Sequence, residues 1–286
     1  MPQQRQHPYT MIRTDAWHVQ AIEELQTMLM SSNDVVALAL FGSALQSSSQ
    51  FDLWSDLDCL LVVKDDTYSQ FYPATEWLRP FGKLHALQQS ENVFHSTTRA
   101  CFVDFRRLDI VITTQSKLDQ LAEWPHVPFW QGVRLLFSRS LQITRLLSQT
   151  WPSPKPTFPS QPEFDEMVNL FWFKAMLASY KVIRNDRLIA LHLALDLVRD
   201  CCVVGMMLRD RVEGTNIHRE GGIGNNVVAK LENACSAYTV TGILDIIEQS
   251  SVQFDQLASQ WSEGYREKRY PLIEWLGNIR RTLSIE

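Results

Sequence analysis

The feature that most constrains this chain is a proline-rich segment near its middle. Residues 151–162 read WPSPKPTFPSQP and contain five prolines. Proline has no backbone N–H and a fixed φ angle, so neither a helix interior nor a central strand accommodates such a run. We therefore expect a linker at 151–162 between two domains, residues 1–150 and 163–286, because 286 residues suffice for two hydrophobic cores.

The hydrophobic patterns on the two sides of this linker differ. Before it, short apolar runs predict strands at 35–41, 57–63, 100–105 and 108–113, among helices at 14–30, 67–78, 116–124 and 132–147. After it, helical periodicity predicts helices at 164–184, 187–212, 227–237, 241–257 and 270–283. The expected fold class is α+β: a mixed sheet flanked by helices, followed by a C-terminal helical bundle.

Composition narrows the possible partners. The net charge is −5 at pH 7, with 27 Lys and Arg against 32 Asp and Glu. A nucleic-acid binder normally has a basic face, so we expect no nucleic-acid partner. Charged residues interrupt the apolar stretches, and the N-terminus has no apolar signal core, so we expect no membrane partner. Five cysteines without C-x-x-C spacing are typical of a cytoplasmic protein.

Chemistry-bearing residues gather between positions 40 and 63. Gly42 and Ser43 end one predicted strand, and Asp56 and Asp58 open the next. Side chains alternate along a strand, so the two carboxylates share one face. Glycine at a strand end lets phosphate oxygens approach the backbone, and the amides of the following turn can donate to them. This pattern predicts half of a metal and phosphate site.

A third carboxylate, Asp109, lies in the later predicted strand RLDIVIT. Transfer of a nucleotidyl group requires two metal ions near the α-phosphate, and magnesium prefers carboxylate oxygens. We therefore predict that Asp56, Asp58 and Asp109 act in catalysis as ligands of two Mg²⁺ ions. The alternative is that the Asp-x-Asp pair lies in a solvated turn without a metal.

These motifs resemble those of the nucleotidyltransferase superfamily that includes DNA polymerase β. The matching elements are Gly42-Ser43, a spacer of twelve residues, Asp56-Leu57-Asp58 and Asp109. Further segments are similar to the bacterial aminoglycoside 6-adenylyltransferases: TEWLRPFGKL (75–84), LDIVIT (108–113) and EFDEMVNLFWF (163–173). The resemblance implies an N-terminal nucleotidyltransferase domain and a helical substrate-binding domain. It also implies magnesium-dependent transfer of AMP from ATP to an antibiotic hydroxyl, and so antibiotic resistance.

The second domain supplies further candidates. Lys174 and Lys181 lie seven residues apart on a largely apolar helix, where they could bind nucleotide phosphates or be surface lysines. In the resembled family a lysine on this helix meets the phosphates, and Lys181 is the better match. The next helix carries His192 and Asp196 on one polar seam with Arg199 and Asp200. The resemblance implies a base for the acceptor hydroxyl on this helix, and either His192 or Asp196 could serve; an internally satisfied cluster is the alternative.

The acceptor is less defined than the chemistry. EGGIGNN (220–226) stands where the resembled family tends to have Gly-Lys, which puts an aminoglycoside acceptor in doubt. The same chemistry on a lincosamide or an endogenous metabolite is one alternative, and a nucleotide-binding protein without catalysis is another. We expect a monomer or a homodimer that binds a nucleoside triphosphate and a small-molecule acceptor.

Overall fold

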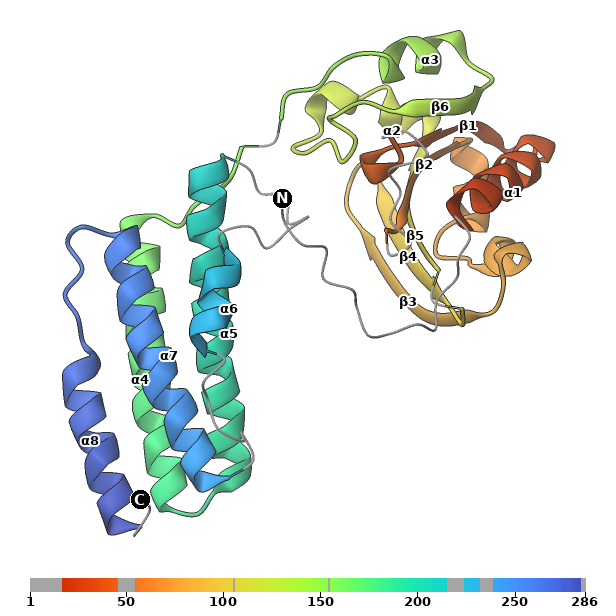
Figure 1. The fold of residues 1–286 in the computed structure, drawn as a ribbon. Helices are drawn as coiled ribbons and strands as arrows, with labels where there is room; N and C mark the ends of the chain where they lie inside the picture. Colours follow the sequence, from red (N-terminus) through yellow and green to blue (C-terminus); the bar gives the residue numbers. More distant parts are fainter. Residues whose placement is uncertain are drawn as a thin grey trace, which may run out of the picture. The chain divides into compact units, whose positions relative to one another are not determined.

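The computed structural model describes residues 17–45, 55–104, 106–153, 155–214, 224–231 and 239–283. The chain divides into two compact units, Met1–Pro154 and Lys155–Glu286 (Figure 1). Among the residues described, no helix combines the length and hydrophobicity needed to cross a bilayer. Cys59, Cys101, Cys201 and Cys202 are free thiols, and Cys235 lies outside the described residues.

The first unit is built on a six-stranded sheet with strand order β3-β4-β5-β2-β1-β6. The two central strands β2 and β5 are parallel, and the other neighbouring pairs are antiparallel, so the sheet is mixed as predicted. The strands are β1 (Val35–Leu40), β2 (Leu57–Val63), β3 (Leu84–Glu91), β4 (Ser96–Phe102), β5 (Arg107–Thr114) and β6 (Arg134–Ser138).

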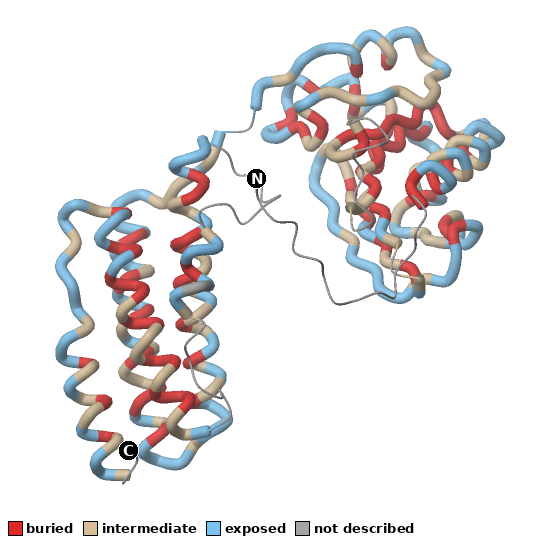
Figure 2. The backbone as a smooth tube through the Cα atoms, in the orientation of Figure 1, coloured by how far each residue is buried: buried red, intermediate tan, exposed pale blue. Residues whose placement is uncertain are grey.

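Each face of this sheet packs against its own hydrophobic core. Cys59 and Leu61 of β2 join a core that includes helix α1 (Trp17–Ser31). Leu60 and Val62 join a second core with residues of α2 (Gln115–Leu118) and α3 (Leu141–Leu147). Figure 2 shows the central strands as the most buried part of this unit. Because side chains alternate, Asp58 lies on the same face as Leu60.

Three predicted segments of the first unit fold differently. The expected helix at 67–78 is replaced by the short 3₁₀ segments η3 (Asp65–Gln70) and η4 (Glu76–Phe81), because the intervening Pro73 cannot continue a helix. The expected helix at 116–124 is one turn of α2 followed by η5 (Leu121–Glu123). Residues 132–147 form β6 and then α3, since a short apolar run such as RLLFS fits a strand as well as a helix.

The second unit is the predicted helical bundle. Its helices are α4 (Gln161–Ile183), α5 (Arg187–Glu213), α6 (Asn225–Leu231), α7 (Val240–Trp261) and α8 (Arg269–Thr282). Together they enclose one hydrophobic core, in which the rings of Phe171 and Phe254 stack 3.8 Å apart. The capping box of Ser160 and Glu163 begins α4 at Gln161, so the last two residues of the proline-rich segment belong to the helix and the linker ends earlier than predicted. Residues 232–237 of the helix predicted at 227–237 lie outside the described residues.

Candidate metal and nucleotide site

The register of β2 and β5 brings three carboxylates together. Asp58 of β2 pairs with Asp109 of β5 across the parallel ladder. Asp56 lies just before β2, two residues from Asp58, and so faces the same way. Oxygen atoms of Asp56, Asp58 and Asp109 all lie within 4.8 Å of one another. The structure therefore gathers the three acids predicted from the sequence, although they come from segments about 50 residues apart.

Gly42 lies directly against this carboxylate group. It opens the 3₁₀ segment η1 (Gly42–Leu45) after β1, with a φ of +64° that favours glycine. A Cβ atom at this position would be 2.2 Å from Oδ2 of Asp58. The Phe41 amide donates to the Asp58 carbonyl at 3.1 Å, and the Ser43 hydroxyl donates to the Asp56 carbonyl at 3.5 Å. The Gly-Ser turn and the Asp-x-Asp pair thus form one packed unit; residues 46–54 of the spacer lie outside the described residues.

Two arginines accompany the carboxylates. The Arg107 guanidinium pairs with Asp56, and Arg99 Nε donates to Asp109 Oδ2 at 3.1 Å. Their side chains are 52% and 56% exposed, so each ion pair is a surface pair. Sequence reasoning did not identify either arginine. If the strand predicted at 100–105 had been extended by one residue toward the N-terminus, Arg99 could have been placed opposite Asp109.

The electrostatics of the site reflect crowded negative charge. Burial raises the pKa of the Asp109 carboxyl, the charge of Asp56 raises it further, and Arg99 and Arg107 oppose the shift. Burial also raises the pKa of the Cys59 thiol, with smaller contributions from Asp58 and Asp109. The Cys59 thiol is protonated and belongs to the core on the opposite face of the sheet, so it is not part of this site.

The chemistry of this donor set suits a hard divalent cation. Three carboxylates supply the oxygen ligands that magnesium prefers, at the end of a strand pair and partly open to solvent. A bound cation would relieve the repulsion between Asp56 and Asp109, which adds to the effect of burial on the pKa of Asp109. Exposed ion pairs contribute about 0–1 kcal/mol each, so displacing Arg99 and Arg107 from the carboxylates costs little.

In the second unit, Lys174 lies among carboxylates of the neighbouring helix. Its Nζ donates to Asp196 at 3.2 Å and also pairs with Asp200. The Lys174 side chain is only 12% exposed. These contacts link α4 to α5, and they hold Asp196 in a fixed position. The structure thus places two of the sequence candidates, Lys174 and Asp196, in one ion-pair cluster.

Lys181 and His192 lie apart from that cluster. Lys181 Nζ donates to Asp186 at 3.0 Å, just before α5 begins, and this bond is the main cause that lowers the pKa of Asp186. His192 is exposed on α5, one turn before Asp196. Of the segment EGGIGNN, residues 220–223 lie outside the described residues, so the loop predicted there has no structural description.

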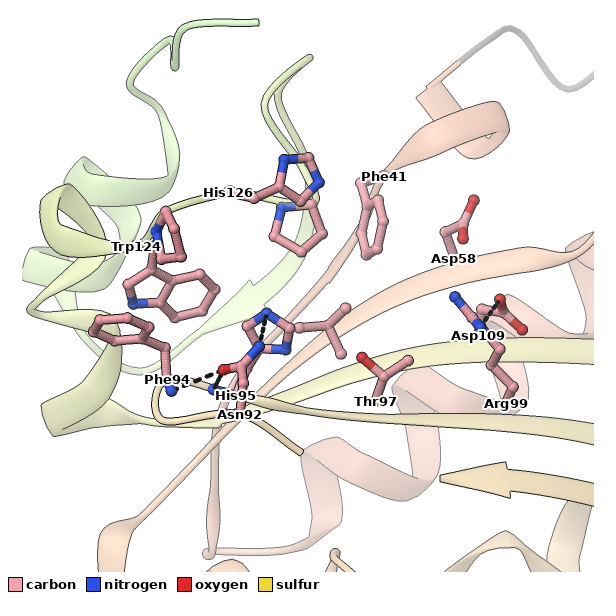
Figure 3. Close-up of a pocket in the computed structure, with 13 residues that line it drawn as sticks. Phe41, Asp58, Asn92, Phe94, His95, Thr97, Arg99, Asp109, Trp124 and His126 are labelled. Atoms are coloured by element: carbon pink, nitrogen blue, oxygen red, sulfur yellow. Dashed lines mark hydrogen bonds and ion pairs between the residues drawn. The ribbon is translucent and has the colours of Figure 1, made fainter. Parts of the chain in front are cut away.

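A cavity opens beside the carboxylates on the same face of the sheet (Figure 3). It holds about 320 Å³ and extends from the acids over β4 and β5 toward a cluster of aromatic rings. Sequence reasoning did not predict it, because its walls come from two loops that the patterns did not connect. Its lining consists of Phe41, Asp58, Asn92, Phe94, His95, Thr97, Arg99, Asp109, Val111, Trp124, Pro125, His126 and Pro128.

Comparison with known families identifies the class of protein that this site defines. The family described as streptomycin adenylyltransferase matches residues 20–209, which is well over half of the chain. The protein is a nucleotidyltransferase, which agrees with the packed Gly-Ser turn and acidic triad. The chain belongs to the streptomycin adenylyltransferase family. No curated protein matches the chain.

Solved structures resemble the chain only distantly. An aminoglycoside 6-adenyltransferase from Bacillus subtilis has 14% identity and a TM-score of 0.37, over 93% of this chain and 99% of its own. A nucleotidyltransferase-like protein from Exiguobacterium sibiricum has 10% identity and a TM-score of 0.28, covering 92% and 88%. A STING-associated CdnE c-di-GMP synthase from Capnocytophaga granulosa has 12% identity and a TM-score of 0.24, covering 93% and 79%. Matches at this level carry no argument about activity.

The contact between Gly42 and Asp58 predicts a specific defect in the variant Gly42→Ala. The new methyl group displaces the Asp58 carboxylate, so we expect Mn²⁺ affinity to fall about tenfold or more. Gly214→Ala is the matched control, because Gly214 has the same φ of +64° and no atom of the described residues lies within 4 Å of the added Cβ. Both variants lose about 1–2 kcal/mol of stability through the backbone. Calorimetry with Mn²⁺ measures the difference, and equal affinities for the two variants would contradict the packed arrangement.

The ion-pair cluster predicts unequal effects for the two lysines. Lys174→Met leaves Asp196 and Asp200 without their cation, so we expect the free energy of unfolding to fall by about 2 kcal/mol. Lys181→Met removes a more exposed pair, and the loss stays below about 1 kcal/mol. Urea unfolding followed by far-ultraviolet circular dichroism measures both. Unchanged stability for Lys174→Met, together with weaker ATP binding, would instead assign this lysine to the phosphates.

Proposed function

We propose that this enzyme transfers AMP from ATP to a hydroxyl group of a small acceptor, with an aminoglycoside-like molecule as the first candidate. The observation that carries the proposal is the pairing of Asp58 with Asp109 beside Gly42, which gathers three carboxylates against a phosphate-binding type of turn. Family membership supports the reaction class. A cytoplasmic location is consistent with the free thiols among the described cysteines.

In this proposal each residue of the site has a defined task. Asp56, Asp58 and Asp109 hold two Mg²⁺ ions, which when bound activate the acceptor hydroxyl and stabilise the leaving pyrophosphate. The amides that follow Gly42 and the Ser43 hydroxyl orient the phosphates. Arg99 and Arg107 balance the carboxylates when no cation is bound, and they swing into solvent when one is.

The roles of the second unit rest on the family resemblance. We propose Lys181, or Lys174, for contact with nucleotide phosphates, and His192 or Asp196 as the base that accepts the hydroxyl proton. His192 is exposed, and the ion pair of Lys181 with Asp186 is more exposed than that of Lys174 with Asp196, which supports His192 and Lys181 for direct contact with a ligand.

The alternative to a transfer enzyme is a nucleotide-binding protein of this fold that does not catalyse transfer. Three carboxylates kept within 4.8 Å repel one another, and a protein that binds no cation gains nothing from that repulsion. Burial is the main cause that raises the pKa of Asp109, and the charge of Asp56 adds to the shift. A lincosamide or an endogenous metabolite as acceptor involves the same residues of the triad, so only an acceptor panel separates those cases.

The transfer reaction predicts the behaviour of two variants. Asp56→Asn and Asp58→Asn should each lower pyrophosphate release by about 1,000-fold, because a metal ligand contributes several kcal/mol to transition-state stabilisation. The assay contains Mg²⁺, labelled ATP and a panel of aminoglycosides and lincosamides. Asp66→Asn, an exposed acid beyond the other end of β2, is the control and should leave the rate unchanged.

The same acceptor panel also decides between the transfer enzyme and the catalytically silent protein. Pyrophosphate release that depends on one acceptor supports the enzyme and names its substrate. Retained activity in both Asp56→Asn and Asp58→Asn would contradict the proposed metal site. Binding of ATP without turnover on any acceptor would favour the catalytically silent protein.

A further inference from the structure

We propose that a second cavity, formed by helices α6 and α7 of the bundle, binds a small uncharged ligand that carries several hydroxyl groups, a sugar ring or a polyol (Figure 1). This α7 cavity has a volume of about 550 Å³ and belongs to the second unit alone. The inference is independent of the proposed function, because it involves none of the residues proposed for nucleotidyl transfer.

The shape of the α7 cavity follows from the spacing of its lining residues. Residues four apart lie one above the other on a helix, so the lining residues of α7 form two parallel rows. The rows extend along about 16 Å of the helix, at 1.5 Å per residue. Lys230 of α6 completes the lining. The first row consists of Asp245, Gln249 and Gln253, and the second of Glu248, Val252 and Gln256.

Two glutamine amides in the middle of the α7 cavity have no hydrogen-bond partner among the described residues. Gln253 carries the inference, because its side chain lines the cavity although the residue is only 3% exposed. The side-chain oxygen of Gln249 is also buried and unpaired. Rotation about the last side-chain bond exchanges the amide oxygen and nitrogen, so Gln249 can present either group to the cavity. Buried amides without partners cost free energy, and a ligand would supply the missing hydrogen bonds.

The charges around the α7 cavity cancel. Arg280 of α8 pairs with Asp245 at 3.0 Å and with Glu248 at 2.6 Å. Lys230 is the second cation, and it donates to Gln256 at 3.0 Å. Two carboxylates are thus matched by two cations, which leaves no surplus charge for a charged ligand. Burial of an unpaired charge costs more than burial of a hydroxyl, so the lining favours an uncharged ligand.

Hydroxyl groups match the remaining polar groups of the α7 cavity. A side-chain amide both donates and accepts hydrogen bonds, and so does a hydroxyl. The described lining contains no aromatic ring and only one apolar side chain, Val252, so it lacks the stacking surface that suits a nucleobase. These properties together select a sugar ring or a polyol, whose neighbouring hydroxyls bond to the amides of Gln249 and Gln253.

The test combines ligand binding with thermal stability on the full chain. Saturation-transfer NMR below neutral pH measures the affinities of two uncharged probes, D-glucose and myo-inositol, and of two charged analogues, D-glucosamine and D-glucuronate. We expect at least one uncharged probe to bind, about tenfold more tightly than either charged analogue. Absence of binding for both uncharged probes, or equal binding of a charged analogue, overturns the inference.

The variant Gln253→Met separates a ligand-binding amide from a structural one. Methionine keeps the length and shape of the side chain but removes its donor and acceptor. Because the amide has no partner in the free protein, we expect the melting temperature to rise or stay the same, while the affinity for the uncharged probe falls about tenfold. A residue that only stabilises the bundle would show the reverse, a lower melting temperature.

Matched variants on the same helix complete the test. Gln260→Met, at an exposed position of α7 outside the cavity, should leave the affinity for the probe unchanged. Gln249→Met tests the same cavity if Gln253→Met does not fold. Unchanged probe affinity in both cavity variants, or a lower melting temperature in both, overturns the inference. Failure of the proposed function appears separately, as absent turnover in the acceptor panel, and does not alter these binding results.

Discussion

The parallel pairing of β2 with β5 is the interaction on which the site depends. It sets Asp58 opposite Asp109, and a shift of one residue in either strand would move one carboxylate to the other face of the sheet. The hydrophobic residues that follow, such as Leu60 and Val111, are buried on the face that carries the acids. Burial of this apolar set therefore fixes the register, and the register brings like charges together despite their repulsion.

That repulsion is balanced locally. Arg99 comes from the antiparallel neighbour β4 and Arg107 from the start of β5 itself, so both cations arise from the strands that position the acids. Both pairs are exposed and weak. A site whose carboxylates are neutralised by weak, exposed ion pairs remains available to a cation that binds more strongly. The turn at Gly42 is fixed in its residue type, because only glycine fits against the Asp58 carboxylate.

The charged residues of the two units are arranged differently. In the first, the acids meet at the end of a strand pair beside a cavity with aromatic walls. In the second, the polar seam of α5 is largely satisfied within the bundle, where Lys174 joins Asp196 and Asp200. The seam thus contributes to the packing of α4 on α5, and His192 remains the exposed member of the candidate pair.

Much of the fold and the acid triad could be predicted because local patterns carry them. The apolar run after Asp58, the spacing of the acids and the long periodic helices depend on near neighbours in sequence. The edge strand β3 was not predicted, since LHALQQSE is polar and largely exposed. The cavity and the two arginines were also missed, because they depend on the register between strands and on loops that meet only in the folded chain.

The number of bound metal ions tests this account most directly. Electron paramagnetic resonance counts Mn²⁺ on the chain in the presence of a non-hydrolysable ATP analogue. We expect two ions per wild-type chain, and fewer for Asp109→Asn with its circular dichroism spectrum unchanged, because Asp109 supplies one carboxylate of the triad. An identical count for the wild-type chain and the variant, or no bound Mn²⁺ on the wild-type chain, would contradict the claim that the β2–β5 register builds a two-metal site.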